Sequence, residues 1–491
     1  MPLDARTPVL VGVGAVMQKQ DDPLAALEAV GLMEEAARRA ARDSGVEEIL
    51  ARVSCIRVTN GIWDYPDPAR LLAERLGAVA ARSELIEVGI LQTTAFAEAA
   101  ANIARGEDEV VLVVGGEAKY RALRAAIAGV TPQVTEQPPG TAPDRFLQPA
   151  REIMHPLELE FGLGMPVNQY AMMESAFRHA RGETVAGNRQ ALGELYAEMS
   201  AVAAGNEAAW SRETYSPGEI SEPSAKNRML AFPYTKRHNS QWNVDQAACL
   251  VLTSLGLARE LGVPEDRFVF PHVVADSNHM ASLVERGDLH RCHGFHCAGR
   301  AALAHAELAI EEVDRLELYS CFPIAVRTQV EELGVPSGRA VTQCGGMAFA
   351  GGPLNNFVFQ AMARMAELLR AHPGETGLVS AVSGQLTKQG VSLWSTTPPS
   401  RPFAHIDVAE EVSAAVPLHE VVGGVQGRAT IVANTVQYAG EDAVAAIFIC
   451  DLPDGRRTLA MSHEAGVIWR ATTEELCGRD AEIGPDGLRP L

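Results

Sequence analysis

Two hydrophobic patterns alternate along the first part of the chain. Continuous apolar runs of strand length occur at 8–16, 55–60, 84–90 and 109–116. Apolar side chains at helical spacing fill the segments between them, at 24–43, 68–77 and 92–105. Because strands that alternate with helices form a parallel sheet with both faces covered, this order predicts an α/β half.

The same order of strands and helices returns about 260 residues later along the chain. Further strands are predicted at 268–274, 315–322, 340–346 and 376–384. Further helices are predicted at 299–313, 323–334 and 355–371. The fold class predicted is therefore α/β with a duplicated half of βαβαβαβ type.

Two regions differ from these halves in composition and in hydrophobic pattern. The segment 120–240 contains a proline-rich stretch at 132–150, expected to be irregular, and a mostly helical stretch at 166–209. After a linker-like stretch at 395–402, short strand-like runs joined by a turn at Asp451–Gly455 predict a small all-β, OB-like module. The predicted divisions are a first half 1–119, an inserted loop domain 120–240, a second half 241–394 and an additional module 403–491.

Composition narrows the class of protein. The 491 residues are 47% hydrophobic and carry a net charge of −20, which disfavours binding to nucleic acid or to an anionic membrane. The chain has eight cysteines, several within apolar runs, which suits buried free thiols in a reducing compartment. No signal peptide and no run of 18 apolar residues is found, so we expect a cytoplasmic protein.

The stretch GGMAFAGGPLNN (345–356) contains two glycine pairs just before a predicted helix. Such loops bring a backbone close to a ligand, and the helix N-terminus that follows favours an anionic group. The ligand-contacting residues expected here are Gly345, Gly346, Gly351, Gly352 and Pro353. None of these side chains can accept a proton or attack a carbon.

The duplicated half, the inserted loop domain and this glycine loop together resemble the thiolase superfamily, and most closely its sterol-carrier branch. The C-terminal module resembles that of thiolase-like proteins type 1. This resemblance implies a thiolase-like fold, a CoA-dependent acyltransferase ancestry in lipid metabolism, and CoA or an acyl-CoA as the ligand. It also leaves two oligomeric states open. Thiolases pair through the edge strand of the first half, which implies a homodimer, whereas a fused tail that covers a neighbouring surface would leave a monomer.

The resemblance places four catalytic elements, and this sequence departs from each of them. The segment 87–100, where a thiolase carries its nucleophilic cysteine, has no cysteine, and its only hydroxyls are those of Thr93 and Thr94. Gly352 stands in place of the activating histidine. The turn with the second catalytic cysteine matches Ser383-Gly384, and Tyr319 replaces the first residue of the family's His-Asp-Cys-Phe tetrad.

Three hypotheses follow for the chemistry. The first is a CoA or acyl-CoA binder without thiolase turnover, because an activated sulfur and a base are both missing. The second is a retro-aldol lyase on a CoA thioester that uses Tyr319. The third is a true acyltransferase with relocated cysteines, for which Cys321, beside Ser320, and Cys344 are the candidates.

Two polar segments have alternative interpretations. HRCHGFHC (290–297) could bind zinc, line the site or be an ordinary loop, but zinc ligands usually come from two separated knuckles, so no metal is expected. Lys236, Arg237 and His238 form one of few basic clusters, which could meet CoA phosphates or be a solvated turn. Gln92 and Thr93, at the start of the 92–105 helix, complete the candidate CoA contacts.

Overall fold

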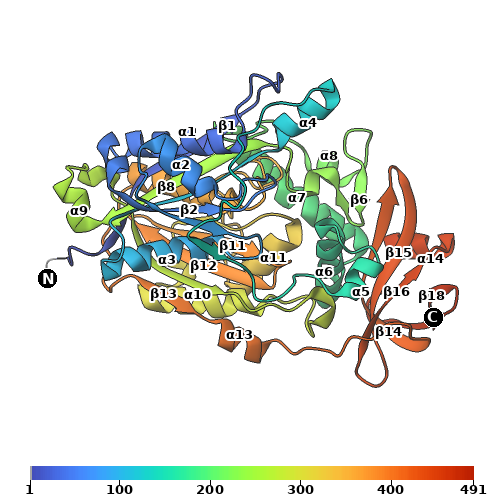
Figure 1. Cartoon of the computed structure of the whole chain (residues 1–491). Coiled ribbons are helices and arrows are strands. Elements are labelled where there is room, and N and C mark those ends of the chain that lie inside the picture. Colours follow the sequence, from blue (N-terminus) through green and yellow to red (C-terminus); the bar gives the residue numbers. More distant parts are fainter. Residues whose placement is uncertain (1–2) are drawn as a thin grey trace.

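A computed structural model describes residues 3–491 (Figure 1). Two sheets face each other across a pair of central helices, and further helices cover their outer faces. A third sheet lies at one end of the molecule and contains the C-terminus. The predicted α/β class is confirmed.

The first sheet consists of six strands in the order β1-β8-β4-β2-β3-β5. Their bounds are β1 Pro8–Gln18, β2 Val53–Thr59, β3 Arg82–Ile86, β4 Val110–Ala118, β5 Arg145–Leu147 and β8 Asp245–Ser254. Most of these strands are buried on both faces, as expected of apolar runs in the middle of a layered α/β protein.

The second sheet has five strands in the order β10-β11-β12-β9-β13. Their bounds are β9 Phe270–Ser277, β10 Arg315–Glu317, β11 Thr376–Ser383, β12 Lys388–Ser395 and β13 Ala404–Asp407. β11 and β12 form an antiparallel hairpin whose turn faces the same end of the molecule as the start of α3.

The helices fall into layers around the two sheets. Those of the halves are α1 Ala29–Asp43, α2 Pro68–Leu76, α3 Gln92–Arg105, α4 Lys119–Ala128, α9 Leu255–Glu260, α10 His293–Ala306, α11 Pro323–Glu332, α12 Phe357–Ala371 and α13 Ala409–Ala415. The side chains of α3 and α12 belong to the core between the sheets, while α1 and α2 form a second core on the outer face of the first sheet. The amphipathic spacing read from the sequence is thus satisfied by burial against a sheet.

The third sheet joins two regions that the sequence separates. The C-terminal strands are β14 Gly427–Ala439, β15 Asp442–Asp451, β16 Arg457–Ser462, β17 Asp480–Gly484 and β18 Gly487–Pro490. The insertion adds β6 Met229–Ala231 and β7 Tyr234–Thr235, with β6 paired to β14 through Ala231 and Gln437. The C-terminal module therefore continues the sheet of the insertion, and one helix, α14 Ala465–Thr473, packs on it.

The insertion is helical as predicted, with α5 Pro156–Glu160, α6 Pro166–Ala180, α7 Val185–Ala204 and α8 Pro217–Ser221. The helix α6 also lies against the C-terminal module (Figure 1). Ser175 Oγ accepts a hydrogen bond from the Asn434 backbone N–H at 2.8 Å, and the buried Arg178 pairs with Glu475 at 2.7 Å.

Two of the predicted divisions do not coincide with the sheets. β8 lies after residue 240, yet it pairs with β1 and β4 in the first sheet. β13 lies after residue 402, yet it pairs with β9 in the second sheet. Each of these two sheets therefore includes a strand from beyond the boundary that composition indicates.

Several predicted elements differ in their bounds from those of the structure. The helix expected from residue 24 begins at Ala29, because the Gln18 side chain hydrogen-bonds both backbone groups of Leu27. The helix expected at 299–313 runs from His293 to Ala306. The strand expected at 315–322 ends at Glu317.

The strand expected at 340–346 is absent from the described chain. The carboxylate of the buried Glu317 accepts the backbone N–H groups of Gln343 and Cys344 and the hydroxyl of Thr342. Because these N–H groups are bonded to a side chain, they cannot join a strand ladder.

The edge of the first sheet is covered by the chain itself. β5 pairs in parallel with β3, through Leu85 and Phe146 at the middle of the contact. A free strand edge offers unpaired backbone groups to another chain, and β5 removes that opportunity at β3.

We expect Arg178→Met to weaken the attachment of the C-terminal module. Removing this buried guanidinium leaves Glu475, itself partly exposed, without its partner, and the cost should be roughly 2 kcal/mol. Urea denaturation with limited proteolysis of the module would measure it. The matched control is Arg181→Met at the same helix end, where an exposed arginine pairs loosely with Glu331 at 3.5 Å and a loss below about 0.5 kcal/mol is expected. Equal losses in the two variants would contradict the prediction.

Candidate functional site

The helix α3 begins against the second sheet. Its N-cap residue is Leu91, whose side chain makes no capping hydrogen bond. The Thr93 side chain is fully buried, and a Cβ added at Gly390 of β12 would lie 2.1 Å from Thr93 Oγ1. The absence of a side chain at Gly390 is therefore what lets the start of the helix reach the sheet.

Thr93 lies in the stretch 87–100 that the resemblance gives to a nucleophile, but no described residue activates it. Its Oγ1 is buried and has no hydrogen-bond partner among the described residues. A hydroxyl attacks a thioester only when a base within hydrogen-bond reach removes its proton. Gln92 donates to Asn355 Oδ1 at 2.8 Å, while Gln92 Oε1 and Asn355 Nδ2 stay unpaired. The first turn of α3 thus holds unsatisfied polar atoms, and the Thr93 hydroxyl has no base among the described residues.

Thr94 is tied to the second sheet through a chain that sequence reasoning missed. Thr94 Oγ1 donates to Asp276 Oδ2 at 2.6 Å, and His405 Nε2 lies 3.0 Å from Asp276 Oδ1. Burial lowers the pKa of His405, but the hydrogen bond and charge of Asp276 outweigh it, so that this pKa is raised. The imidazolium therefore helps to hold the carboxylate that anchors Thr94.

The glycines of the 345–353 loop pack closely against other segments of the protein. Gly345 has φ +99°, and a Cβ there would lie 2.4 Å from backbone atoms of Ala203 in α7. A Cβ at Gly351 would lie 2.1 Å from Gln246 Oε1 of β8. Gly346 packs on Met199, and Gly352, with Pro353 after it, lies beside Ser240. The glycine pairs have a packing reason of their own, and their contact with a ligand stays a prediction.

Tyr319 is held by its backbone at the end of the second sheet. Its N–H donates to Ser380 Oγ and its carbonyl accepts from Gln329 Nε2, both at 2.8 Å. The ring lies edge-on to Phe357, with centroids 6.1 Å apart. Burial, together with the neighbouring Cys321, raises the pKa of Tyr319, so the phenol stays protonated at neutral pH and does not act as a base.

Neither candidate cysteine is a thiolate. Burial raises the pKa of Cys321 to about 12. Burial and the adjacent Glu317 carboxylate raise the pKa of Cys344 well above its ordinary value. Ser320 Oγ accepts the Met347 N–H at 3.0 Å and so serves the glycine loop. Both thiols remain neutral and weakly nucleophilic at pH 7.

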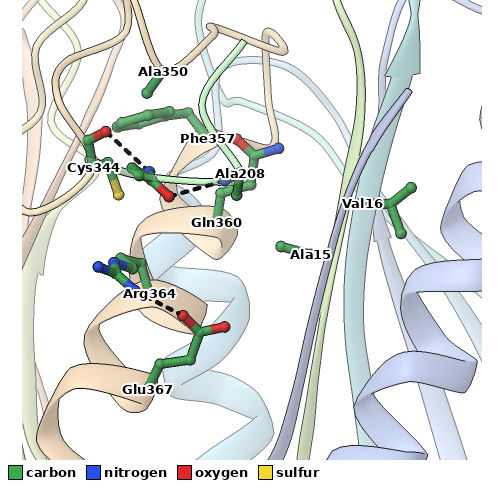
Figure 2. Close-up of a pocket in the computed structure, with 10 residues that line it drawn as sticks. Ala15, Val16, Ala208, Cys344, Ala350, Phe357, Gln360, Arg364 and Glu367 are labelled. Carbon is green, nitrogen blue, oxygen red and sulfur yellow. Dashed lines mark hydrogen bonds and ion pairs between the residues drawn. The ribbon is translucent and has the colours of Figure 1, made fainter. Parts of the chain in front are cut away.

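Figure 2 shows a small cavity behind the glycine loop, between α12 and the end of β1. Its volume is about 30 Å³, and Cys344, Ala350 and Phe357 lie at the loop side. Arg364 and Glu367 of α12 form an ion pair at 3.2 Å at the other side. A space of this size holds about one water molecule and no acyl chain.

The hairpin between β11 and β12 contains Ser383 and Gly384. Ser383 ends β11 opposite Lys388, and Gly384, Gln385 and Leu386 all have positive φ values, from +58° to +64°. Lys388, which sequence reasoning did not single out, begins β12 and is buried beside the start of α3. The only sequence signal was a lone lysine at the start of an apolar strand.

The three basic candidates do not converge on one place. Lys236 is exposed, and Arg237 lies over the Tyr215 ring at 4.2 Å and lines a surface cavity of about 520 Å³. His238 points into the core, where burial lowers its pKa to about 3, so it is neutral. Lys236 and Arg237 stay candidate contacts for phosphates.

The segment 290–297 forms a loop and the first turns of α10. His293 Nε2 lies 3.1 Å from Asp288, and Cys292 and Cys297 are buried. No group of three or more His, Cys, Asp or Glu side chains within residues 3–491 could hold a metal ion. None of the helices in the same range is both long and apolar enough to cross a bilayer.

The layered halves, the insertion and the two helix starts between the sheets define a thiolase-like fold, and comparison with solved structures confirms it. A monomeric SCP2-thiolase-like protein type 1 from Mycobacterium smegmatis is 27% identical, with a TM-score of 0.82 and coverage of 100% of both chains. An Ltp2-ChsH2(DUF35) aldolase is 19% identical, with a TM-score of 0.61, over 80% of this chain and 98% of that one.

Human mitochondrial 3-ketoacyl-CoA thiolase, solved in complex with CoA, is 16% identical, with a TM-score of 0.56, over 79% of this chain and 98% of that one. Because the aldolase and this thiolase are only 19% and 16% identical to the chain, their similarity shows a shared fold and nothing more. No protein-family model matches the chain, and no curated protein sequence does.

We expect Gly345→Ala to destabilise the protein more than Gly374→Ala. Both glycines have φ above +90°, so each substitution carries a backbone cost of about 1–2 kcal/mol. Only at Gly345 does the new methyl meet another backbone, that of Ala203, which adds about 1–3 kcal/mol. Urea denaturation of both variants measures the difference. Equal losses would show that the loop does not need this close approach.

We expect the stabilisation from His405 to depend on pH. Because the pKa of His405 is raised in the folded protein, its contribution is complete below the unfolded value of about 6.5 and disappears as pH rises through the folded value. The free-energy difference between wild type and His405→Gln should be about 1 kcal/mol at pH 5.5 and smaller at pH 9. Denaturant titrations at the two pH values test this, and a difference that grows with pH would contradict it.

Proposed function

We propose that this protein binds CoA or an acyl-CoA between the two sheets and does not carry out thiolase turnover. The observation that carries the proposal is the start of α3, where a thiolase-like fold presents Thr93 with an unpaired hydroxyl and no base. A Claisen condensation or its reverse needs an activated sulfur and a base at the α-carbon.

The polar atoms at this place support binding. Thr93 Oγ1, Gln92 Oε1 and Asn355 Nδ2 are buried and unpaired, and buried polar groups normally have partners. A thioester carbonyl with its neighbouring amide would supply both acceptors and donors. A structural neighbour, the human thiolase, is solved with CoA, and this chain shares its fold over 79% of its length.

The protonation states argue against an acyltransferase with relocated cysteines. Cys321 and Cys344 are buried thiols with raised pKa values. Acyl transfer through either cysteine would require its buried thiol to become accessible to the acyl group and to lose its proton. Their packing and their neighbours fit inert, apolar roles.

A lyase is the second candidate, favoured by Tyr319 at the end of the second sheet. Its raised pKa keeps the phenol protonated, and a protonated phenol can give its proton to an enolate. A retro-aldol cleavage also needs a base for the β-hydroxyl, and the described neighbours of Tyr319 supply none: Cys321 is a neutral thiol, and Ser380 donates to Gln329. An aldolase is among the structural neighbours, at an identity that shows fold only.

By full-length similarity to the SCP2-thiolase-like protein type 1, we infer that this chain is a protein of the same type. β5 covers the edge of β3, and that neighbour is monomeric, so we propose a monomer for this chain as well.

We expect wild-type protein to bind CoA in isothermal titration and to show no covalent acyl adduct on any cysteine by mass spectrometry. Incubation with a mixture of acyl-CoA thioesters should release no free CoA above the protein-free rate. The absence of CoA binding at millimolar concentration would overturn the binding proposal.

Tyr319→Phe separates the lyase from the binder. If cleavage of a β-hydroxyacyl-CoA occurs, is lost in Tyr319→Phe and persists in Tyr120→Phe, the protein is a lyase. Tyr120 is a suitable control because its hydroxyl bonds only Asp21 at an exposed position. An acyl adduct mapped to Cys321 or Cys344 would instead show a transferase.

A further inference from the structure

Lys388 is a buried lysine that the packing of the fold does not explain. Its side chain is 1% exposed, at the first residue of β12. It lies on the same strand face as Gly390, which touches Thr93, so it extends toward the segment before α3. There Nζ donates a hydrogen bond of 2.6 Å to the carbonyl of Gly89.

This lysine has no counter-ion. Among residues 3–491, no carboxylate lies within ion-pair distance of its Nζ, and the Gly89 carbonyl is its one hydrogen-bond partner. Burial alone lowers the pKa of Lys388. A buried ammonium without a partner is costly, and a neutral donor such as glutamine would satisfy one carbonyl without that cost.

Two further features of the place favour an anion, while the nearby carboxylate of Asp276 is already paired with Thr94 and His405. The N-terminus of α3 is the positive end of a 14-residue helix and has no side-chain cap. Thr93 Oγ1, on its first turn, is fully buried and unpaired. A cation, a positive helix end and an unpaired hydroxyl together favour a negatively charged oxygen between them.

The amine lies one layer below the surface. Gly89, which accepts its hydrogen bond, is covered by Pro149 and Ile153. These belong to an irregular segment whose residues 150–152 are exposed.

We propose that Lys388 and the start of α3 form a binding site for a carboxylate on the acyl group, so that the preferred ligands are CoA thioesters of dicarboxylic acids. This inference rests on the proposed function and goes beyond it, because it names the class of acyl group. A neutral acyl chain would leave the ammonium unpaired, whereas a carboxylate would pair with it.

Isothermal titration of wild-type protein with CoA, acetyl-CoA, malonyl-CoA and succinyl-CoA tests the proposal. We expect at least one of the two dicarboxylic thioesters to bind about 10- to 100-fold more tightly than acetyl-CoA, as one charge-assisted pair would give. Lys388→Met should abolish this preference while retaining binding of CoA itself. Lys388→Arg, which keeps the charge, should retain part of the preference.

Lys19→Met, at an exposed position just after β1, is the matched control and should behave as wild type. If no CoA compound binds, the proposed function itself fails. If CoA and all three thioesters bind equally, the proposed function stands and the carboxylate site is overturned. A preference that survives in Lys388→Met also overturns the assignment to this lysine. Should Lys388→Met not fold, the wild-type series and Lys388→Arg still decide between these outcomes.

Discussion

The contact between the start of α3 and β12 is the constraint on which the candidate site depends. Thr93 lies in the fully buried space that a side chain at Gly390 would fill. This contact sets the depth at which the helix enters the second sheet. It also encloses the Thr93 hydroxyl, so the same packing that stabilises the fold removes access for a general base to that hydroxyl. The chemistry of the site follows from this position more than from any single substitution.

Charged groups lie on two sides of that contact, a paired carboxylate on one side and an unpaired ammonium on the other. On one side, Asp276 holds Thr94 and is itself held by His405 of β13. On the other, Lys388 bonds a carbonyl and no acid. The paired carboxylate is already neutralised, so the positive end of α3 and the ammonium are left without compensation. A protein whose net charge is −20 thus keeps a small positive interior at one helix end.

The sequence predicted what depends on local periodicity and missed what depends on distant partners. The segment 92–105 shows helical spacing over its whole length, and its predicted bounds match those of α3. The 340–346 segment has strand composition, yet Glu317 captures its N–H groups, and no local pattern shows that. Likewise, the residues around Thr93 followed from the resemblance, but Asp276 and His405 lie 182 and 129 residues from their partners.

The shared third sheet connects the C-terminal module to the wall of the site. β14 pairs with β6, and β6 pairs with β7, which leads directly into the turn with His238. From there Ser240 bonds the carbonyl of Cys321 and packs against Gly352. The module is therefore connected to the glycine loop through strand pairing, the turn after β7 and the contacts of Ser240. This connection gives the C-terminal segment a physical role as a brace for the loop even without chemistry of its own.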